Sequence, residues 1–213
     1  MANYFSKYPT TYYALDEGES GLNTVTYLTN RIGFDQKVLN NAALYSNYFI
    51  KDGDTPENLA HKLYGDSEKH WIILMANRII DPQFDWPMDS RTLIKFIEDK
   101  YVSRANTGQT GFEWANQNTE SYYRVETKVI SSNGLEVDDV YQIDADTYAT
   151  LNTSNESYTK TLEDGEVLTV TVRKTRRTYL EYEEQVNESK RTIKILDKTY
   201  LPMVMNELKT IFK

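Results

Sequence analysis

The chain has 213 residues, of which 24 are basic and 32 acidic, so its formal net charge is −8. It has no cysteine, which excludes a disulfide framework, a thiolate metal site and a cysteine nucleophile. The acidic balance argues against a general nucleic-acid binder, because neutralising phosphates needs an excess of lysine and arginine. Hydrophobic residues make up 39%, enough to bury a core, and 17 tyrosines stand beside 7 phenylalanines and 3 tryptophans.

Residues 1–46 are polar and aromatic with poor periodicity, and we expect them to form an extended interaction arm. Residues 24–28 alternate and predict a short strand. Such a segment cannot build its own core, so its aromatic side chains cover either a partner or the rest of this chain. We expect at least part of the arm to contact another subunit, through Tyr4, Phe5, Tyr8, Tyr12 and Tyr13.

The first residues lack the charged start and apolar run of a secretory signal, and no run approaches the ~18 apolar residues of a membrane span. We therefore expect synthesis in a reducing cytoplasm, without a membrane partner.

Residues 47–101 carry the clearest secondary-structure pattern. A short apolar strand around Tyr48 leads into an Asp-Gly-Asp-Thr turn, and Asp54 or Thr55 is placed to cap a helix that stops at Gly65. Ser67 can cap a second helix, with Trp71 in its buried stripe. A third helix is expected after Asp89-Ser90, so this region predicts a βαα unit with a flanking helix.

The remainder changes character twice. Residues 102–120 are polar and contain glycine, which predicts a linker. Residues 121–213 are rich in strand patterns, notably at 122–130 and 167–172, and end in an amphipathic helix over 201–212. Together these patterns predict an α+β fold, although they leave open whether 121–213 is a separate domain.

Residue patterns of catalysis are nearly absent. His61 and His70 flank a helix break with no convincing third ligand, so surface histidines are the favoured interpretation. Asp144-Ala-Asp146 begins like a calcium loop but lacks its later glycine and glutamate. We therefore expect a protein that is not an enzyme and has no catalytic residue, cofactor or metal site. The weakest alternative is a hydrolase that uses one of two carboxylate pairs, Asp52 with Asp54 or Asp138 with Asp139.

The charge is unevenly placed along the sequence. Residues 1–172 carry 14 basic and 26 acidic side chains, whereas residues 173–213 carry 10 basic and 6 acidic ones. The basic part opens with a cluster that we interpret first as a solvated strand face or turn and second as a docking site for an acidic protein surface. The cluster consists of Arg173, Lys174, Arg176 and Arg177.

The segment from residue 48 to residue 77 resembles a LysM domain, which has an aromatic strand, a Gly-Asp-Thr turn, a Leu-Ala helix and a glycine stop. The usual closing strand is not found soon after the asparagine, so we expect it elsewhere, with Tyr122–Ile130 as the candidate. The residues of this signature, to which we assign structural roles, are Tyr48, Gly53, Asp54, Thr55, Leu59, Ala60, Gly65, Trp71 and Asn77.

The wider pattern is similar to the LysM-like baseplate wedge proteins, protein 53 type, of T-even-like contractile-tailed phages. It rests on the aromatic lead, on Lys51–Glu57, on Tyr64–Trp71, on Asp81-Pro82 before Asp85-Trp86, and on Lys190–Asp197. The resemblance implies a structural virion subunit, assembled in the host cytoplasm and present in several copies in a symmetric baseplate.

Its partners would be other wedge proteins and the inner baseplate protein from which the tail sheath starts. The alternative from the same residues is a LysM-type module that binds peptidoglycan glycans in a cell-wall protein.

Overall fold

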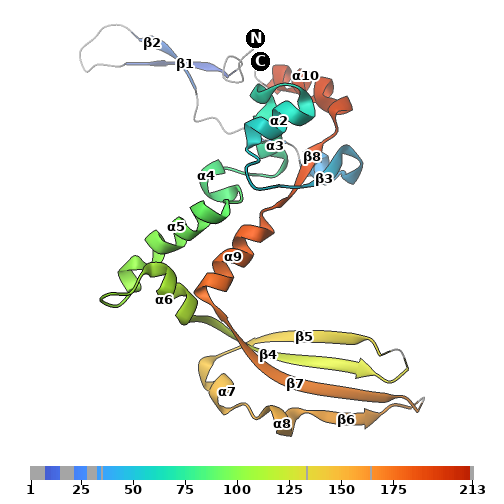
Figure 1. The fold of residues 1–213 in the computed structure, drawn as a ribbon. Helices are drawn as coiled ribbons and strands as arrows, with labels where there is room; N and C mark the ends of the chain where they lie inside the picture. Colours follow the sequence, from blue (N-terminus) through green and yellow to red (C-terminus); the bar gives the residue numbers. More distant parts are fainter. Residues whose placement is uncertain are drawn as a thin grey trace. The chain divides into compact units, whose positions relative to one another are not determined.

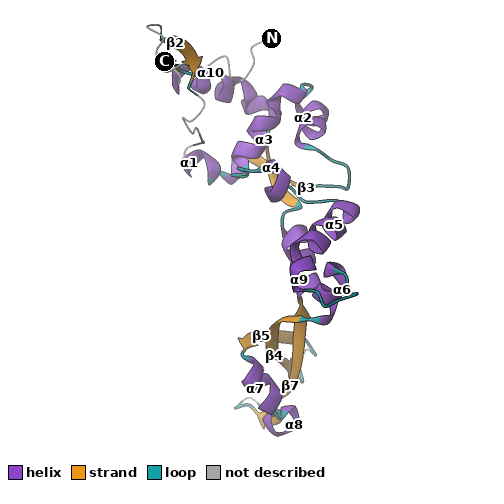
Figure 2. Cartoon of the chain, turned by 90° about the vertical axis from the view of Figure 1, so that its left-hand side faces the viewer, coloured by secondary structure: helices purple, strands orange, loops and turns teal. Residues whose placement is uncertain are grey.

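The protein is a mixed α+β chain that divides into two compact units, seen in a computed structural model that describes residues 8–14, 22–27, 33–34, 36–132, 134–163 and 165–211 (Figures 1 and 2). Unit 1 comprises Met1–Asp89 with Ser189–Lys213, and unit 2 comprises Ser90–Glu188. The division differs from the expected one because the last part of the chain returns to unit 1. Unit 1 carries 13 basic and 14 acidic residues and unit 2 carries 11 and 18, so most of the negative charge belongs to unit 2.

Unit 1 is formed by the two ends of the chain. Its strands are β1 (Thr10–Tyr13), β2 (Asn23–Thr26), β3 (Tyr45–Phe49) and β8 (Thr192–Leu196). Its α-helices are α1 (Gln36–Leu39), α2 (Pro56–Tyr64), α3 (His70–Ala76), α4 (Pro82–Asp85) and α10 (Leu201–Ile211), and its 3-10 turns are η2 (Ala42–Leu44), η3 (Ser67–Lys69) and η5 (Lys198–Tyr200).

The strand that closes the β3–α2–α3 unit is β8. It pairs antiparallel with β3, from Tyr45 opposite Leu196 to Phe49 opposite Thr192. The expectation of Tyr122–Ile130 as the closing strand is therefore wrong. Apolar side chains of β8 fill the same core as α2 and α3, which is the physical reason for the pairing; this core contains Ile50, Leu59, Ile72, Ile73, Trp71, Trp86, Ile193, Ile195 and Leu196.

The ends of α2 follow local chemistry. The Thr55 hydroxyl accepts a hydrogen bond from the Asn58 N–H (3.2 Å), and Pro56 occupies the first turn, where its missing N–H costs nothing. Gly65 ends the helix with a φ of +76°, a left-handed conformation that glycine adopts without a Cβ penalty. The expected cap at Ser67 is instead at Asp66, which accepts from the Glu68 N–H.

The amphipathic C-terminal helix is present as α10. Leu201 and Val204 are buried in the core of unit 1, with Met205 packed against it. The side chains of Ile211 and Phe212, which we expected on the apolar face, lie outside the described residues. Within the described ranges, no helix combines the length and apolar character needed to cross a membrane.

The helical part of unit 2 contains α5 (Ser90–Tyr101), η4 (Val102–Arg104), α6 (Gly111–Gln117) and α9 (Tyr179–Ser189). Residues 102–120, which we expected to be a linker, thus contain a helix whose first residue packs tightly on α5. A Cβ at Gly111 would lie 2.2 Å from the backbone oxygen of Glu98, so only glycine permits this approach. The Glu98 carboxylate then accepts from the N–H groups of Gly111 (3.0 Å) and Phe112 (2.8 Å).

The rest of unit 2 is a four-stranded antiparallel sheet in the order β5-β4-β7-β6 (Figure 1). Its centre consists of the two longest strands, β4 (Thr119–Ile130) and β7 (Val167–Thr178), both of which include the runs expected from alternation. The edge strands are β5 (Glu136–Ile143) and β6 (Tyr158–Thr161), and the short helices α7 (Ala145–Thr150) and α8 (Thr153–Glu156) lie between them in sequence.

Candidate functional site

The N-terminal arm contains a two-stranded hairpin with exposed aromatic side chains. β1 and β2 pair antiparallel from Thr10 opposite Thr26 to Tyr13 opposite Asn23, and the Tyr27 N–H donates to the Pro9 carbonyl (2.8 Å). The side chains of Tyr12 and Tyr13 are 71% and 60% exposed. An isolated two-stranded sheet is only marginally stable in water, so a surface that covers this hairpin would stabilise it.

Of the other three predicted arm residues, the structure describes one. Tyr8 is partly buried, and Tyr4 and Phe5 lie outside the described residues. Tyr12 and Tyr13 are consecutive residues of the exposed strand β1, so their side chains point to opposite faces of the hairpin; β1 is the best defined part of the candidate arm.

The predicted basic cluster lies on β7, where successive side chains point to opposite faces of the sheet. Arg173 forms an ion pair with Asp138 of β5 (2.6 Å). The Lys174 ammonium donates to the carbonyls of Tyr148 (2.9 Å) and Leu151 (3.3 Å), and so it holds α7 against the sheet. The cluster is therefore not one continuous docking patch, because its members are divided between two faces.

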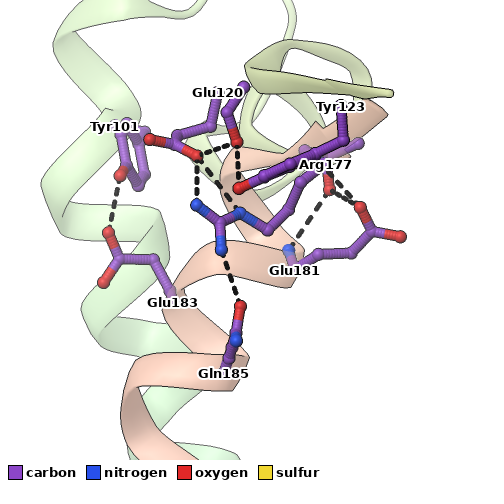
Figure 3. A network of polar contacts seen from close by, with 9 residues as sticks. Tyr101, Glu120, Tyr123, Arg177, Glu181, Glu183 and Gln185 are labelled. Carbon is purple, nitrogen blue, oxygen red and sulfur yellow. Dashed lines mark hydrogen bonds and ion pairs between the residues drawn. The ribbon is translucent and has the colours of Figure 1, made fainter. Parts of the chain in front are cut away.

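Arg177 is the most heavily engaged member of the cluster (Figure 3). Its guanidinium donates to Glu120 (2.7 Å) at the start of β4 and to Gln185 (2.7 Å) on α9. The same group lies over the rings of Tyr123 (5.4 Å) and Tyr182 (5.0 Å), at cation–π distance. These contacts join the sheet to α9, which indicates an internal structural role for Arg177.

The carboxyl of Glu120, which accepts from Arg177, has a pKa that its neighbours lower. The Ser121 hydroxyl donates to Glu120 (2.6 Å) and, with the Arg177 guanidinium, lowers the pKa of the Glu120 carboxyl against the opposing effect of burial. Within the part of the chain that the structure describes, Arg176 is the cluster member whose side chain is exposed and makes no polar contact.

A buried carboxylate that the sequence did not reveal lies on α9. Glu183 is only 5% exposed and accepts from the Tyr101 hydroxyl (2.6 Å) and from Lys100 (2.7 Å), both on α5. Burial, followed by the interaction with Glu183, raises the pKa of the Tyr101 hydroxyl. Since a buried charge is tolerated when it is paired and hydrogen-bonded, this contact fixes α9 against α5.

Several signature residues of the β3–α2–α3 region support the turn before α2. The Asp54 carboxylate accepts from the Tyr48 hydroxyl (2.9 Å) and the Lys51 N–H (3.0 Å). Partial burial acts to raise the pKa of this carboxyl, but these hydrogen bonds and the charges of Lys62 and Lys51 lower it on balance. Gly53, with a φ of +88°, allows the sharp turn, and the buried Trp86 indole donates to the Asp54 carbonyl (2.9 Å).

The other signature residues point into the core or pair with backbone. Leu59 and Ala60 are fully buried, and Trp71 lies in the same core. The Asn77 amide donates to the Lys194 carbonyl (2.8 Å) and accepts from the Lys194 N–H (2.7 Å), so it satisfies one backbone position of β8 as a neighbouring strand would. These residues therefore make the contacts described here within their own chain.

Residues considered for chemistry are not brought into one cluster. His70 places its Nδ1 3.0 Å from the Ser67 carbonyl, a local contact within its own turn. Asp144 caps α7 by accepting from the Thr147 N–H (2.8 Å). Among the residues that the structure describes, no group of three or more histidine, cysteine, aspartate or glutamate side chains is placed to hold a metal ion.

The fold and these surfaces define an α+β protein whose best defined candidate for function is a contact surface, the aromatic hairpin of unit 1. Residues 4–211 match the family model described as "Base plate wedge protein 53", and the chain therefore belongs to that family, as the resemblance predicted.

A curated relative, "Baseplate wedge protein gp53" of Enterobacteria phage T4, is 30% identical over 79 residues. This match covers 37% of the present chain and 39% of the relative, so it spans about two fifths of the relative's length.

Proposed function

We propose that the protein is a structural subunit of a phage baseplate wedge and that the β1–β2 hairpin docks it onto a neighbouring subunit. Membership of the wedge family supports the role, and the exposure of Tyr12 and Tyr13 carries the assignment of the docking element. Aromatic side chains bury a large area at modest entropic cost, and they are enriched at the energetic centres of protein interfaces.

The two units have different tasks in this proposal. The β3–α2–α3–β8 region of unit 1 is a LysM-like core that follows the hairpin in sequence and presents a rigid surface. The partners are other wedge proteins and the inner protein from which the sheath starts, in a symmetric assembly of several copies that forms in the host cytoplasm. No catalytic step is required of the protein in this role.

A LysM-type glycan-binding module has less support. Tyr48, Asp54 and Asn77, which carry the LysM resemblance, use their polar groups on their own chain. A family match over residues 4–211 also extends far beyond the LysM-like segment, which favours the wedge role.

Replacing both Tyr12 and Tyr13 with serine tests the docking role. We expect purified phage baseplates to incorporate the double variant on the order of tenfold less than the wild type, since the loss of about 1.4 kcal/mol of interface free energy from the two rings together weakens binding tenfold. The melting temperature of the isolated protein should stay unchanged, because both rings are exposed.

Tyr158→Ser is the matched control, because Tyr158 is also an exposed strand tyrosine but lies on β6 of unit 2. It should incorporate normally. Normal incorporation of the Tyr12/Tyr13 double variant would show that the hairpin is not the docking element.

A further inference from the structure

The outer edge of β5 is open, and acidic side chains are the one usual protection of edge strands that its sequence carries. β5 pairs with β4 over eight consecutive positions without a bulge, and the sheet order places no described strand on its other side (Figure 1). Natural edge strands are usually short, or carry proline, lysine or a bulge that discourages pairing. The opposite edge strand, β6, is four residues long and contains Lys160, whereas Glu136–Ile143 contains no proline, lysine or arginine.

The ladder shows which backbone groups face outward. Just after β4, Ser131 donates its N–H to the Val167 carbonyl (3.0 Å), and this pair continues the register of β4 with β7. Hydrogen-bonded pairs alternate along an antiparallel ladder, so the odd-numbered residues of β4 use their backbone groups toward β7. Even-numbered residues of β4 then bond to odd-numbered residues of β5. The backbone N–H and carbonyl groups on the open edge are therefore those of Glu136, Asp138, Val140 and Gln142.

The carboxylates in the middle of β5 are already neutralised within the unit. Asp138 pairs with Arg173 (2.6 Å) and accepts from the Thr127 hydroxyl (2.6 Å), and Asp139 pairs with Lys128. A strand that approaches the edge therefore meets these carboxylates with their charge compensated. Val140, which follows Asp139 in the strand, is 59% exposed, and Val137 and Tyr141 are exposed as well.

We propose that β5 pairs with β5 of a second copy of this chain, antiparallel across a two-fold axis at Val140. In this arrangement the outward-facing groups of each strand bond to those of the other, and the two four-stranded sheets become one continuous sheet. The same patch is used on both copies, as in two-fold homodimers generally. The register pairs Val140 with Val140, Val137 with Ile143, Asp139 with Tyr141, and Asp138 with Gln142 of the second copy.

The sequence of β5 is self-complementary in this register. Apolar side chains meet apolar ones on both faces, and each aspartate of the strand comes opposite an uncharged residue, whereas like charges directly opposite would destabilise the pair. The single like-charge pair falls at the strand ends, where Glu136 comes opposite Asp144 of the second copy. The Asp144 carboxylate is turned back onto the Thr147 N–H (2.8 Å), which weakens that repulsion.

Sedimentation velocity of the full chain over a wide concentration range tests the pairing. We expect the wild type to associate to twice its monomer mass. Val140→Lys and Val140→Glu each place like charges opposite one another on the two-fold axis, so each variant alone should stay monomeric. An equimolar mixture of the two should recover the dimer, because lysine then faces glutamate.

Val140→Thr is the matched control: it keeps the branched side chain and the outward N–H and should dimerise like the wild type. Since Val140 is exposed, all variants should fold, which circular dichroism checks. A wild type that stays monomeric throughout, a Val140→Lys variant that still dimerises, or a mixture that fails to associate would overturn the proposal. None of these results bears on the wedge role, which rests on the family match and on docking through the β1–β2 hairpin of unit 1.

Discussion

Replacing Gly111 with alanine is expected to destabilise unit 2 by about 3 kcal/mol, the upper part of the usual range for overpacking. On an open helix surface the same change would stabilise by up to about 1 kcal/mol, because alanine is the better helix former. Here the new methyl group would lie 2.2 Å from the Glu98 oxygen and 2.7 Å from the Val102 nitrogen, both backbone atoms of α5 and η4 that cannot rotate away. The clash therefore reverses the sign of the effect.

Urea denaturation followed by circular dichroism measures the loss. Hydrogen exchange should locate it: peptides from α5 and α6 should exchange faster, while those from α2 and α3 should keep their protection. Asn116→Ala, at an exposed position of the same α6, is the control and should change stability by less than about 0.5 kcal/mol. Wild-type stability of Gly111→Ala would mean that α6 does not pack on α5 in this way.

Truncating Trp71 to alanine is expected to cost about 3–5 kcal/mol in the stability of unit 1, as for other buried tryptophans. Trp71 is 7% exposed and lies in the core with Leu59 and Ile193, so its removal leaves a cavity where α2, α3 and β8 meet. The loss should therefore affect both ends of the chain together. Thermal unfolding measures it.

Ile80→Ala is the matched control for Trp71, since Ile80 is a large apolar residue of the same unit that is 69% exposed. The melting temperature of the Ile80→Ala variant should stay within a few degrees of that of the wild type. If Trp71→Ala melted as Ile80→Ala does, Trp71 would lie on the surface and the assignment of the core would be wrong.

Local chemistry made part of the fold predictable. Thr55, Pro56 and Gly65 each act through backbone groups within four residues, so the bounds of α2 can be derived from the sequence. The alternation of β4 and β7 and the apolar spacing of α10 are also visible in a short window. Local sequence could not decide whether Asp54 or Thr55 caps α2. The Asp54 carboxylate accepts from the Tyr48 hydroxyl across the turn, and Thr55 is the cap.

Long-range pairing was not predictable in the same way. The partner of β3 is β8, at the other end of the sequence, and nothing near Tyr45 indicates which of several strands will pair with it. Residues 102–120 were expected to be a linker because polar residues dominate them, but Gly111 and Glu98 create a tight contact that only the folded chain reveals.

The candidate site was predictable only in outline. The density of aromatic residues points to Tyr12 and Tyr13 without any knowledge of contacts, and the structure shows both side chains exposed. The basic cluster is a group in sequence only, because alternation along β7 divides its side chains between two faces. Glu120, which contacts Arg177, lies on the neighbouring strand β4 but is far away in sequence. Family resemblance added the role, which no single residue pattern carried.

The central claim is that this chain is a structural part of the baseplate wedge. Quantitative mass spectrometry of baseplates purified from the phage that encodes it tests this claim most directly. We predict that the chain is present in a fixed ratio to the other wedge proteins and that particles made without it lack complete baseplates. Complete baseplates that contain none of this chain would contradict the account.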